Sequence, residues 1–299
     1  MEHTAVKKLK LANGSEWNFV PTGDTVGVVE KAASLLGLSN GSPRSGTNII
    51  FVLGDPRVQN KAAPGIDQYP ELHHLPANGW KPLYLGEIRL WTHSVVSDVL
   101  CEVNGLAGNI HEVTRLYLSL LPLYNQVVYS GGLPFHAAMI EHAGKCVLIT
   151  ATSGTGKSTC CRRVPDPWKP LCDDETVLVR TGREYRAHPF PTWSNYLSGR
   201  TEIPCNVQQS LPPAGIFFLE QAQIDQVLPV KNSMAAHALF NSAKHVYYKF
   251  NIYLTKDELY NLNRKLFENA CELSQSVPIF KLQASLGGQF WEEMDKVLQ

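Results

Sequence analysis

Short apolar runs alternate with loops rich in glycine, proline and asparagine along residues 8–104. The runs 48–53 and 83–90 are bounded by turn residues, which is typical of strands. Between residues 25 and 36, apolar positions recur three and four apart, and this spacing predicts a helix with one buried face. We therefore expect a smaller α+β domain over residues 1–107, to which the sequence assigns no role.

A second pattern begins with helical spacing over 109–124, where Pro122 is expected to break the last turn. The apolar runs 135–142 and 146–150 flank an Ala-Gly turn, which predicts a β-hairpin. Further strands are expected over 170–180, 215–219 and 279–282, and helices over 234–243, 257–273 and 289–298. The expected fold class is therefore α/β (α+β), with a second domain over residues 108–299.

Composition mainly excludes some classes of function. The 27 basic and 27 acidic residues cancel, so the chain lacks the long-range field that would attract nucleic acid or an anionic membrane. No apolar segment reaches transmembrane length, and no signal-peptide pattern follows the N-terminal lysines. The seven cysteines are odd in number and scattered, which fits free thiols in a reducing compartment. We expect a cytoplasmic protein that binds neither nucleic acid nor membrane.

Residues 151–158 read Ala-Thr-Ser-Gly-Thr-Gly-Lys-Ser and follow the apolar run 147–149. This is the context and, except at its first position, the pattern of a phosphate-binding P-loop, or Walker A motif. Its glycines let backbone N–H groups turn toward the phosphates, and the start of the next helix adds partial positive charge. Lys157 would contact the β and γ phosphates of ATP, and Ser158 would bind Mg²⁺. The expected nucleotide-binding residues are Ser153, Gly154, Thr155, Gly156, Lys157, Ser158 and Thr159.

Ala151 occupies the position where the P-loop pattern has glycine. The change matters if the backbone there needs a positive φ or approaches the nucleotide very closely. The octet is otherwise explained as a Gly- and Ser-rich turn that ends in lysine by chance. The strand before it and the acidic residues after it favour phosphate binding.

Two adjacent carboxylates, Asp173 and Asp174, stand at the end of an apolar segment downstream of the loop. Phosphoryl transfer to a hydroxyl needs one carboxylate to hold magnesium and a second to accept the hydroxyl proton. Adjacent side chains on a strand point to opposite faces, so the strand must bend locally if both are to serve. A solvated acidic strand end is the alternative interpretation.

With these residues, the chain resembles the HPr kinase/phosphorylase group, whose P-loop domain is related to phosphoenolpyruvate carboxykinase. In that group a histidine opens a strand, a second strand leads into the P-loop, and an Asp-Asp pair follows. Here the corresponding segments are His136 to Met139, 147–150, 153–158, Asp173 and Asp174. The resemblance covers residues 133–180 well and the remainder loosely. It implies that Asp173 is the hydroxyl-activating base, that Asp174 is a magnesium ligand, and that His136 lies beside the reacting phosphate.

The chain also departs from the bifunctional enzyme of that group. Ala151 and Thr152 replace Gly-Asp, and the C-terminal half has no clear match to the signature loop, which disfavours phosphorylase activity. The segment 188–194 and Arg200 resemble instead the kinase-like proteins that accompany peptide-modification cassettes, including the C protein of the SynChlorMet type. Arg200 would neutralise charge on the transferred phosphoryl group, or is a surface arginine. The prolines and tryptophan of 188–194 are expected to form a rigid loop.

The predicted function is that of an ATP- and Mg²⁺-dependent kinase. It would transfer the γ-phosphoryl group to a hydroxyl of a peptide, a protein or a small molecule. The alternative is a nucleotide-gated binding or scaffold protein that has lost transfer chemistry, an option that Ala151 raises. A true carboxykinase is disfavoured because that enzyme is about twice as long and needs more metal ligands. Relatives of the HPr kinase type are often hexamers, so the resemblance admits a homo-oligomer.

Overall fold

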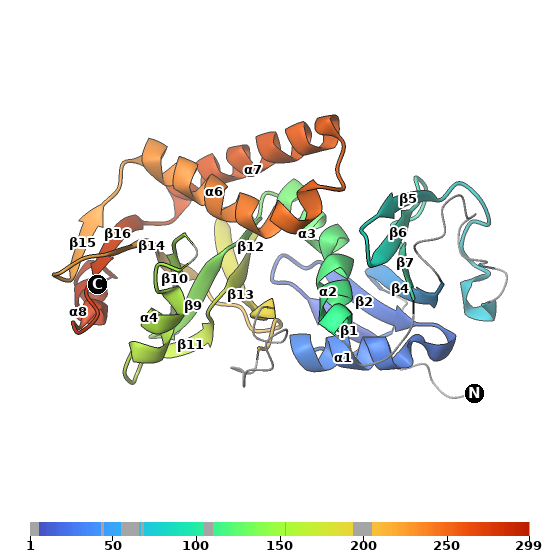
Figure 1. The fold of residues 1–299 in the computed structure, drawn as a ribbon, viewed down its shortest axis with the longest axis horizontal. Helices are drawn as coiled ribbons and strands as arrows, with labels where there is room; N and C mark the ends of the chain where they lie inside the picture. The colour runs from blue at the N-terminus through green and yellow to red at the C-terminus, as the bar shows by residue number, and fades with distance from the viewer. Residues whose placement is uncertain are drawn as a thin grey trace. The chain divides into compact units, whose positions relative to one another are not determined.

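The computed structural model describes residues 6–42, 45–54, 66, 69–104, 110–152, 154–193 and 205–298. Strands among these residues form three sheets, which together with the helices give the mixed α/β class that the sequence predicts (Figure 1). The chain divides into two compact units. The N-terminal unit comprises Met1–Leu123 with Trp193–Arg200, and the C-terminal unit Tyr124–Thr192 with Thr201–Gln299.

The N-terminal unit is built on a mixed sheet with strand order β3-β1-β2-β4-β7-β6-β5. Its strands are β1 (Lys7–Lys10), β2 (Glu16–Pro21), β3 (Ser39–Asn40), β4 (Thr47–Leu53), β5 (Lys81–Tyr84), β6 (Ile88–Thr92) and β7 (Val99–Val103). Its helices are η1 (Gly23–Thr25), α1 (Val26–Leu36), η3 (Pro70–Leu72) and α2 (Ile110–Ser119). Helix α1 buries the apolar face predicted for it and ends at Gly37, where φ is 61°. The left-handed conformation of this glycine terminates the helix.

Two expectations for the N-terminal half need correction. The apolar run 83–90 is not one strand but the hairpin of β5 and β6, because the chain turns at Gly86, where φ is 68°. The helix over 109–124 is likewise two helices, since α2 ends at Ser119 and α3 (Leu121–Tyr129) follows. Pro122 lies in the first turn of α3, where its missing N–H is not needed. The boundary between the two units falls within α3.

The C-terminal unit contains a large sheet of order β11-β9-β10-β14-β16-β15 and a small sheet of order β13-β12-β8. Its strands are β8 (Leu133–Phe135), β9 (Ala137–His142), β10 (Lys145–Thr150), β11 (Lys169–Cys172), β12 (Glu175–Thr181), β13 (Glu184–Phe190), β14 (Pro213–Gln221), β15 (Gln226–Pro229) and β16 (Ile279–Ala284). Its described helices after α3 are α4 (Lys157–Arg163), α6 (Asn232–Asn251), α7 (Lys256–Ser276) and α8 (Phe290–Leu298). The predicted hairpin of β9 and β10 is confirmed.

Two segments that the sequence presents as single strands pass from one sheet to the other. The run 135–142 is divided at His136, between β8 in the small sheet and β9 in the large sheet. The predicted strand 170–180 is divided at Asp173 and Asp174, between β11 and β12. Because β9 pairs with β11 and β8 pairs with β12, both breaks lie at the junction of the two sheets.

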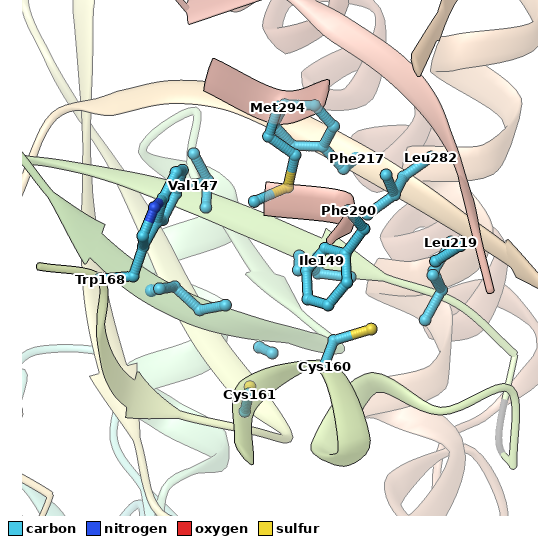
Figure 2. Packing of buried hydrophobic residues seen from close by; sticks show 13 residues of the cluster. Val147, Ile149, Cys160, Cys161, Trp168, Phe217, Leu219, Leu282, Phe290 and Met294 are labelled. Atoms are coloured by element: carbon cyan, nitrogen blue, oxygen red, sulfur yellow. The ribbon is translucent and has the colours of Figure 1, made fainter. Parts of the chain in front are cut away.

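A hydrophobic cluster packs the large sheet against α4 and α8 (Figure 2). It includes Trp168, Val147 and Ile149 of β10, Phe217 and Leu219 of β14, Leu282 of β16, Cys160 and Cys161 of α4, and Phe290 and Met294 of α8. Burial of each valine, leucine, isoleucine, phenylalanine or methionine side chain contributes about 1.5–3 kcal/mol. The cluster fixes the end of β10 and the start of α4, and hence the ends of the loop between them.

Other elements show where local patterns were insufficient. Strand β13 includes Pro189, although residues 188–194 were expected to form a rigid loop. A proline is tolerated there because β13 is an edge strand. Helix α6 extends well beyond the predicted 234–243, whereas α7 and α8 lie close to their predicted bounds. Among helices of the described ranges, none combines the length and apolar composition needed to cross a membrane.

Candidate functional site

The described segments that carry predicted site residues meet at one edge of the large sheet. Strand β10 ends at Thr150, whose register partner is Ala137, the first residue of the antiparallel strand β9. His136 therefore lies beside the start of the loop that follows β10. Strand β11 pairs antiparallel with β9 and ends at Cys172, so Asp173 leaves the sheet at the same edge. The parallel strands β14 and β16 present their carboxyl ends there too, where ligands bind in open α/β sheets.

The loop between β10 and α4 has a conformation that requires glycine. Gly154 has φ 81° and Gly156, the residue before α4, has φ 114°, a region in which other residues are strained. No described atom lies within 4 Å of the place that a Cβ would occupy at either glycine. Backbone conformation rather than crowding therefore selects glycine. The strand, loop and helix expected around the motif are present, whereas Ser153 lies outside the described residues.

Ala151 does not strain the loop. Among the described non-glycine residues, Ala143 alone has a positive φ, so the backbone at Ala151 is one that any residue adopts. Its methyl group packs against the hydrophobic cluster of the large sheet. The first position of the motif thus has no conformational need for glycine in this chain.

Lys157 is the first residue of α4 and is buried, with 7% of its surface exposed. Its ammonium nitrogen lies 2.8 Å from His136 Nε2 and donates to the carbonyl oxygen of Ala151 at 3.2 Å. Burial lowers the pKa of Lys157, and the carboxylates of Asp174 and Asp173 oppose this shift. The loop thus holds the ammonium group of Lys157 next to two neutral acceptors, and the oxygens of a bound polyanion could replace these acceptors.

His136 connects this cation to Asp174, because its Nδ1 lies 3.2 Å from Asp174 Oδ1. An ammonium group can only donate, so Nε2 of His136 accepts and Nδ1 carries the proton that is donated to the carboxylate. Burial favours a raised pKa at Asp174, but the hydrogen bond from His136 and the charge of Lys157 hold that pKa below its usual value. Asp174 is therefore ionised at neutral pH.

The two carboxylates diverge at the junction of the sheets. Asp174 contacts His136, whereas Asp173 accepts a hydrogen bond from the hydroxyl of Thr192. Both side chains are half-buried. The chain bends here because β11 ends just before Asp173 and β12 begins at Glu175. This is the local bend that two adjacent carboxylates need if both are to serve one site.

Helix α6 adds two residues that sequence reasoning missed. The hydroxyl of Ser242 donates to the carbonyl oxygen of His136 at 3.1 Å, and the ring of His245 lies 4.2 Å from that of His136. Burial lowers the pKa of His245. The helical spacing continues through the buried residues Val246 and Phe250, and this signal would have extended the predicted helix to include His245. No local pattern predicts its contact with His136.

The segment 188–194 contributes less than the sequence suggested. His188 is buried in β13, where its Nδ1 lies 2.7 Å from the carbonyl oxygen of Val207. Burial lowers its pKa to about 4, so this histidine is neutral and structural. Thr192 contacts Asp173, as described above. Arg200 lies outside the described residues.

A cavity of about 860 Å³ borders the glycine loop. It is lined by Gly154 to Gly156, by one face of α4 from Thr159 to Arg163, and by the segments that end β14 and β16. Its volume lies in the range of small-molecule sites. The charged cluster and the cavity therefore share the glycine loop as a common wall.

Comparison with known families assigns the chain. A model of the family described as SynChlorMet cassette protein ScmC matches residues 99–299. The protein belongs to this family. The match includes the whole described C-terminal unit and hence every residue of the site; it excludes most of the N-terminal sheet. Comparison with curated proteins gives no match.

The described residues of this family member contain no group of three or more His, Cys, Asp or Glu side chains placed to hold a metal. Magnesium does not require such a cage, because it is commonly bound through one or two protein oxygens, phosphate oxygens and water. Ser158 is half-buried in the first turn of α4, and Asp174 is ionised beside Lys157. These oxygen donors fit magnesium that arrives with a triphosphate.

Proposed function

We propose that the protein is a kinase that uses Mg²⁺ and ATP to phosphorylate a hydroxyl of a peptide, a protein or a small molecule. The observation that carries this proposal is the series of contacts from Lys157 through His136 to Asp174, beside a loop with left-handed glycines. A cation for the phosphates and two carboxylates are the groups that phosphoryl transfer uses. Their order along the chain resembles the HPr kinase/phosphorylase group, which supports the same class of chemistry.

In the proposed reaction, the acceptor oxygen attacks the γ-phosphorus, the bond from this phosphorus to the β–γ bridging oxygen breaks, and ADP leaves. Asp173 accepts the hydroxyl proton, and Lys157 binds phosphate oxygens. Ser158 and Asp174 would hold Mg²⁺, which would neutralise phosphate charge when it is bound. Thr155, Gly156 and Thr159 contribute backbone donors to the phosphates, together with the other residues of the loop.

His136 has a positioning role in this scheme. In the free protein it separates Lys157 from Asp174 and contacts both. A phosphate oxygen carries negative charge that the neutral imidazole nitrogen of His136 lacks, so it attracts the ammonium group of Lys157 more strongly. Lys157 therefore exchanges His136 for phosphate oxygens when a triphosphate binds, and the hydrogen bond from His136 keeps Asp174 oriented.

The kinase is favoured over a scaffold that has lost catalysis. The scaffold hypothesis arose from Ala151, which replaces a glycine of the motif. In this chain the backbone at Ala151 has no positive φ and its methyl group packs on the core. The residue therefore gives no reason to expect a damaged loop, and both carboxylates needed for transfer are present.

A direct test combines binding with transfer. Titration calorimetry with Mg-ATP is followed by incubation with γ-labelled ATP and a degenerate pool of peptides containing Ser, Thr and Tyr, together with small polyols. Wild type is compared with Asp173→Asn and with Asp257→Asn, an exposed carboxylate in α7 that serves as the control. We expect Asp173→Asn to bind ATP but to lose about 10²–10⁴-fold in transfer rate.

Two results would overturn parts of the proposal. Binding of ATP without label on any hydroxyl would leave only the nucleotide-gated binding protein. If calorimetry detected no heat of binding with Mg-ATP, the proposal that the protein binds a nucleotide would be refuted.

A further inference from the structure

The cavity beside the glycine loop has a lining that differs from the charged cluster. Apolar side chains come from Leu219, Ala222 and Leu286, and uncharged polar groups from Thr159, Gln223 and Ser285. Such a mixture suits a flat apolar group with hydrogen-bonding edges and a few hydroxyls. Away from the glycine loop, the described lining has one cationic side chain, that of Arg163.

Arg163 is the charged residue among the described cavity lining, and its guanidinium is already engaged. Its Nη1 donates to the carbonyl oxygen of Ser285 at 2.8 Å, and its Nη2 donates to the carbonyl oxygen of Gly288. The side chain therefore builds the cavity wall. Because these donors are used in the wall, Arg163 would bind an anionic ligand less strongly than an arginine without such hydrogen bonds.

The wall formed by the residues after β16 is preorganised. The backbone N–H of Ser285 donates to Asp225 Oδ1 at 2.5 Å. A Cβ at Gly288 would collide with the carboxylate of Asp225, so glycine permits this close approach. Arg163 and Asp225 thus hold the segment from two sides in the free protein, and a ligand would not have to order it.

Gln221 connects the cavity to the phosphate loop. It ends β14, lines the cavity, and donates from Nε2 to the carbonyl oxygen of Thr155 at 3.1 Å. The cavity also continues along α4 from Thr159, the residue after Ser158. A ligand in the cavity therefore contacts the loop that is proposed to bind the phosphates.

We propose that this cavity is the subsite for the base and ribose of the nucleotide, with the base against Leu286 and Ala222. The amides and hydroxyls of the lining would contact the edge of the base and the ribose hydroxyls. The inference rests on the proposed function, because it assigns the nucleoside end of the ligand whose phosphates the loop binds. The cavity discriminates a nucleoside triphosphate from inorganic triphosphate.

The test compares Mg-ATP with Mg-triphosphate by calorimetry in wild type, in Ala222→Trp and in Ile224→Trp. Ala222 lines the cavity, whereas Ile224 is 77% exposed on the same turn and is not part of the lining. We expect wild type to bind ATP at least about tenfold more tightly than triphosphate, a factor equivalent to about 1.4 kcal/mol. We expect Ala222→Trp to lose this preference while keeping its affinity for triphosphate, and Ile224→Trp to behave as wild type.

Equal affinity of wild type for ATP and triphosphate would overturn the subsite while leaving the phosphate site intact, and this comparison needs no variant. Retention of the preference in a folded Ala222→Trp would also overturn it. Failure of wild type to bind either ligand would instead refute the proposed function, and the subsite with it.

Discussion

Replacement of Lys157 by methionine separates the functional role of this residue from its structural role. Methionine has a similar length and no charge, so it removes the ammonium group and retains most of the packing. In the free protein the variant loses the contacts to His136 Nε2 and to the Ala151 carbonyl oxygen. The substitution also removes a positive charge that burial disfavours, because burial lowers the pKa of Lys157.

These effects oppose each other. Each lost hydrogen bond costs about 0.5–1.5 kcal/mol, and removal of a charge that burial disfavours offsets part of this cost. We therefore expect the free energy of unfolding of unliganded Lys157→Met to lie within about 1 kcal/mol of wild type. Mg-ATP at a hundredfold excess over its dissociation constant should stabilise wild type by about 2.7 kcal/mol. The variant should gain almost none of this.

Thermal unfolding with and without Mg-ATP measures both quantities. The ligand should raise the melting temperature of wild type by about 5–11 °C, at about 2–4 °C per kcal/mol. Lys256→Met, an exposed lysine at the start of α7, is the control and should retain the full shift. A full ligand shift in Lys157→Met would refute the assignment of Lys157 to the phosphates. Loss of more than about 3 kcal/mol without ligand would show that the lysine is mainly structural.

Other predictions follow from single contacts. Gly156→Ala should lower the free energy of unfolding by about 1–2 kcal/mol because φ is 114° there, whereas Ala151→Gly should destabilise by about 0.4–1 kcal/mol without raising activity; urea unfolding and the transfer assay decide both. Tyr124→Phe removes a hydrogen bond to the buried carboxylate of Glu175 and should cost about 1.5–3 kcal/mol in urea unfolding; a change near zero would contradict this. The pKa of Asp174 in the folded protein is lowered from its usual value of 3.8, so ionised Asp174 stabilises the fold at pH values above 3.8. This stability is lost as the pH falls through the lower pKa of the folded state. Asp174→Asn should therefore show a weaker loss of stability below about pH 4 than wild type, and identical acid unfolding curves would argue against it.

The sequence alone determined the features that depend on short-range periodicity and backbone chemistry. Apolar spacing predicted α1 and α7, because each helix has one buried face that recurs at the helical period. The β9–β10 hairpin was predicted by two continuous apolar runs on either side of a turn, and both strands are buried on both faces. The two glycines of the loop indicated a left-handed backbone, because residues other than glycine rarely adopt that conformation. The residue types needed for phosphoryl transfer were visible as Lys157 and the Asp pair.

Only the tertiary structure decided how these residues come together. An apolar run has the same pattern whichever sheet it joins, so the transfers between sheets at His136 and at Asp173–Asp174 had no local signature. The contact of His245 with His136 depends on packing of α6 over the junction of the sheets, and the cavity depends on where three parallel strands end. These features arise from pairing between distant segments, which is set by burial in the whole unit and not by neighbours along the chain.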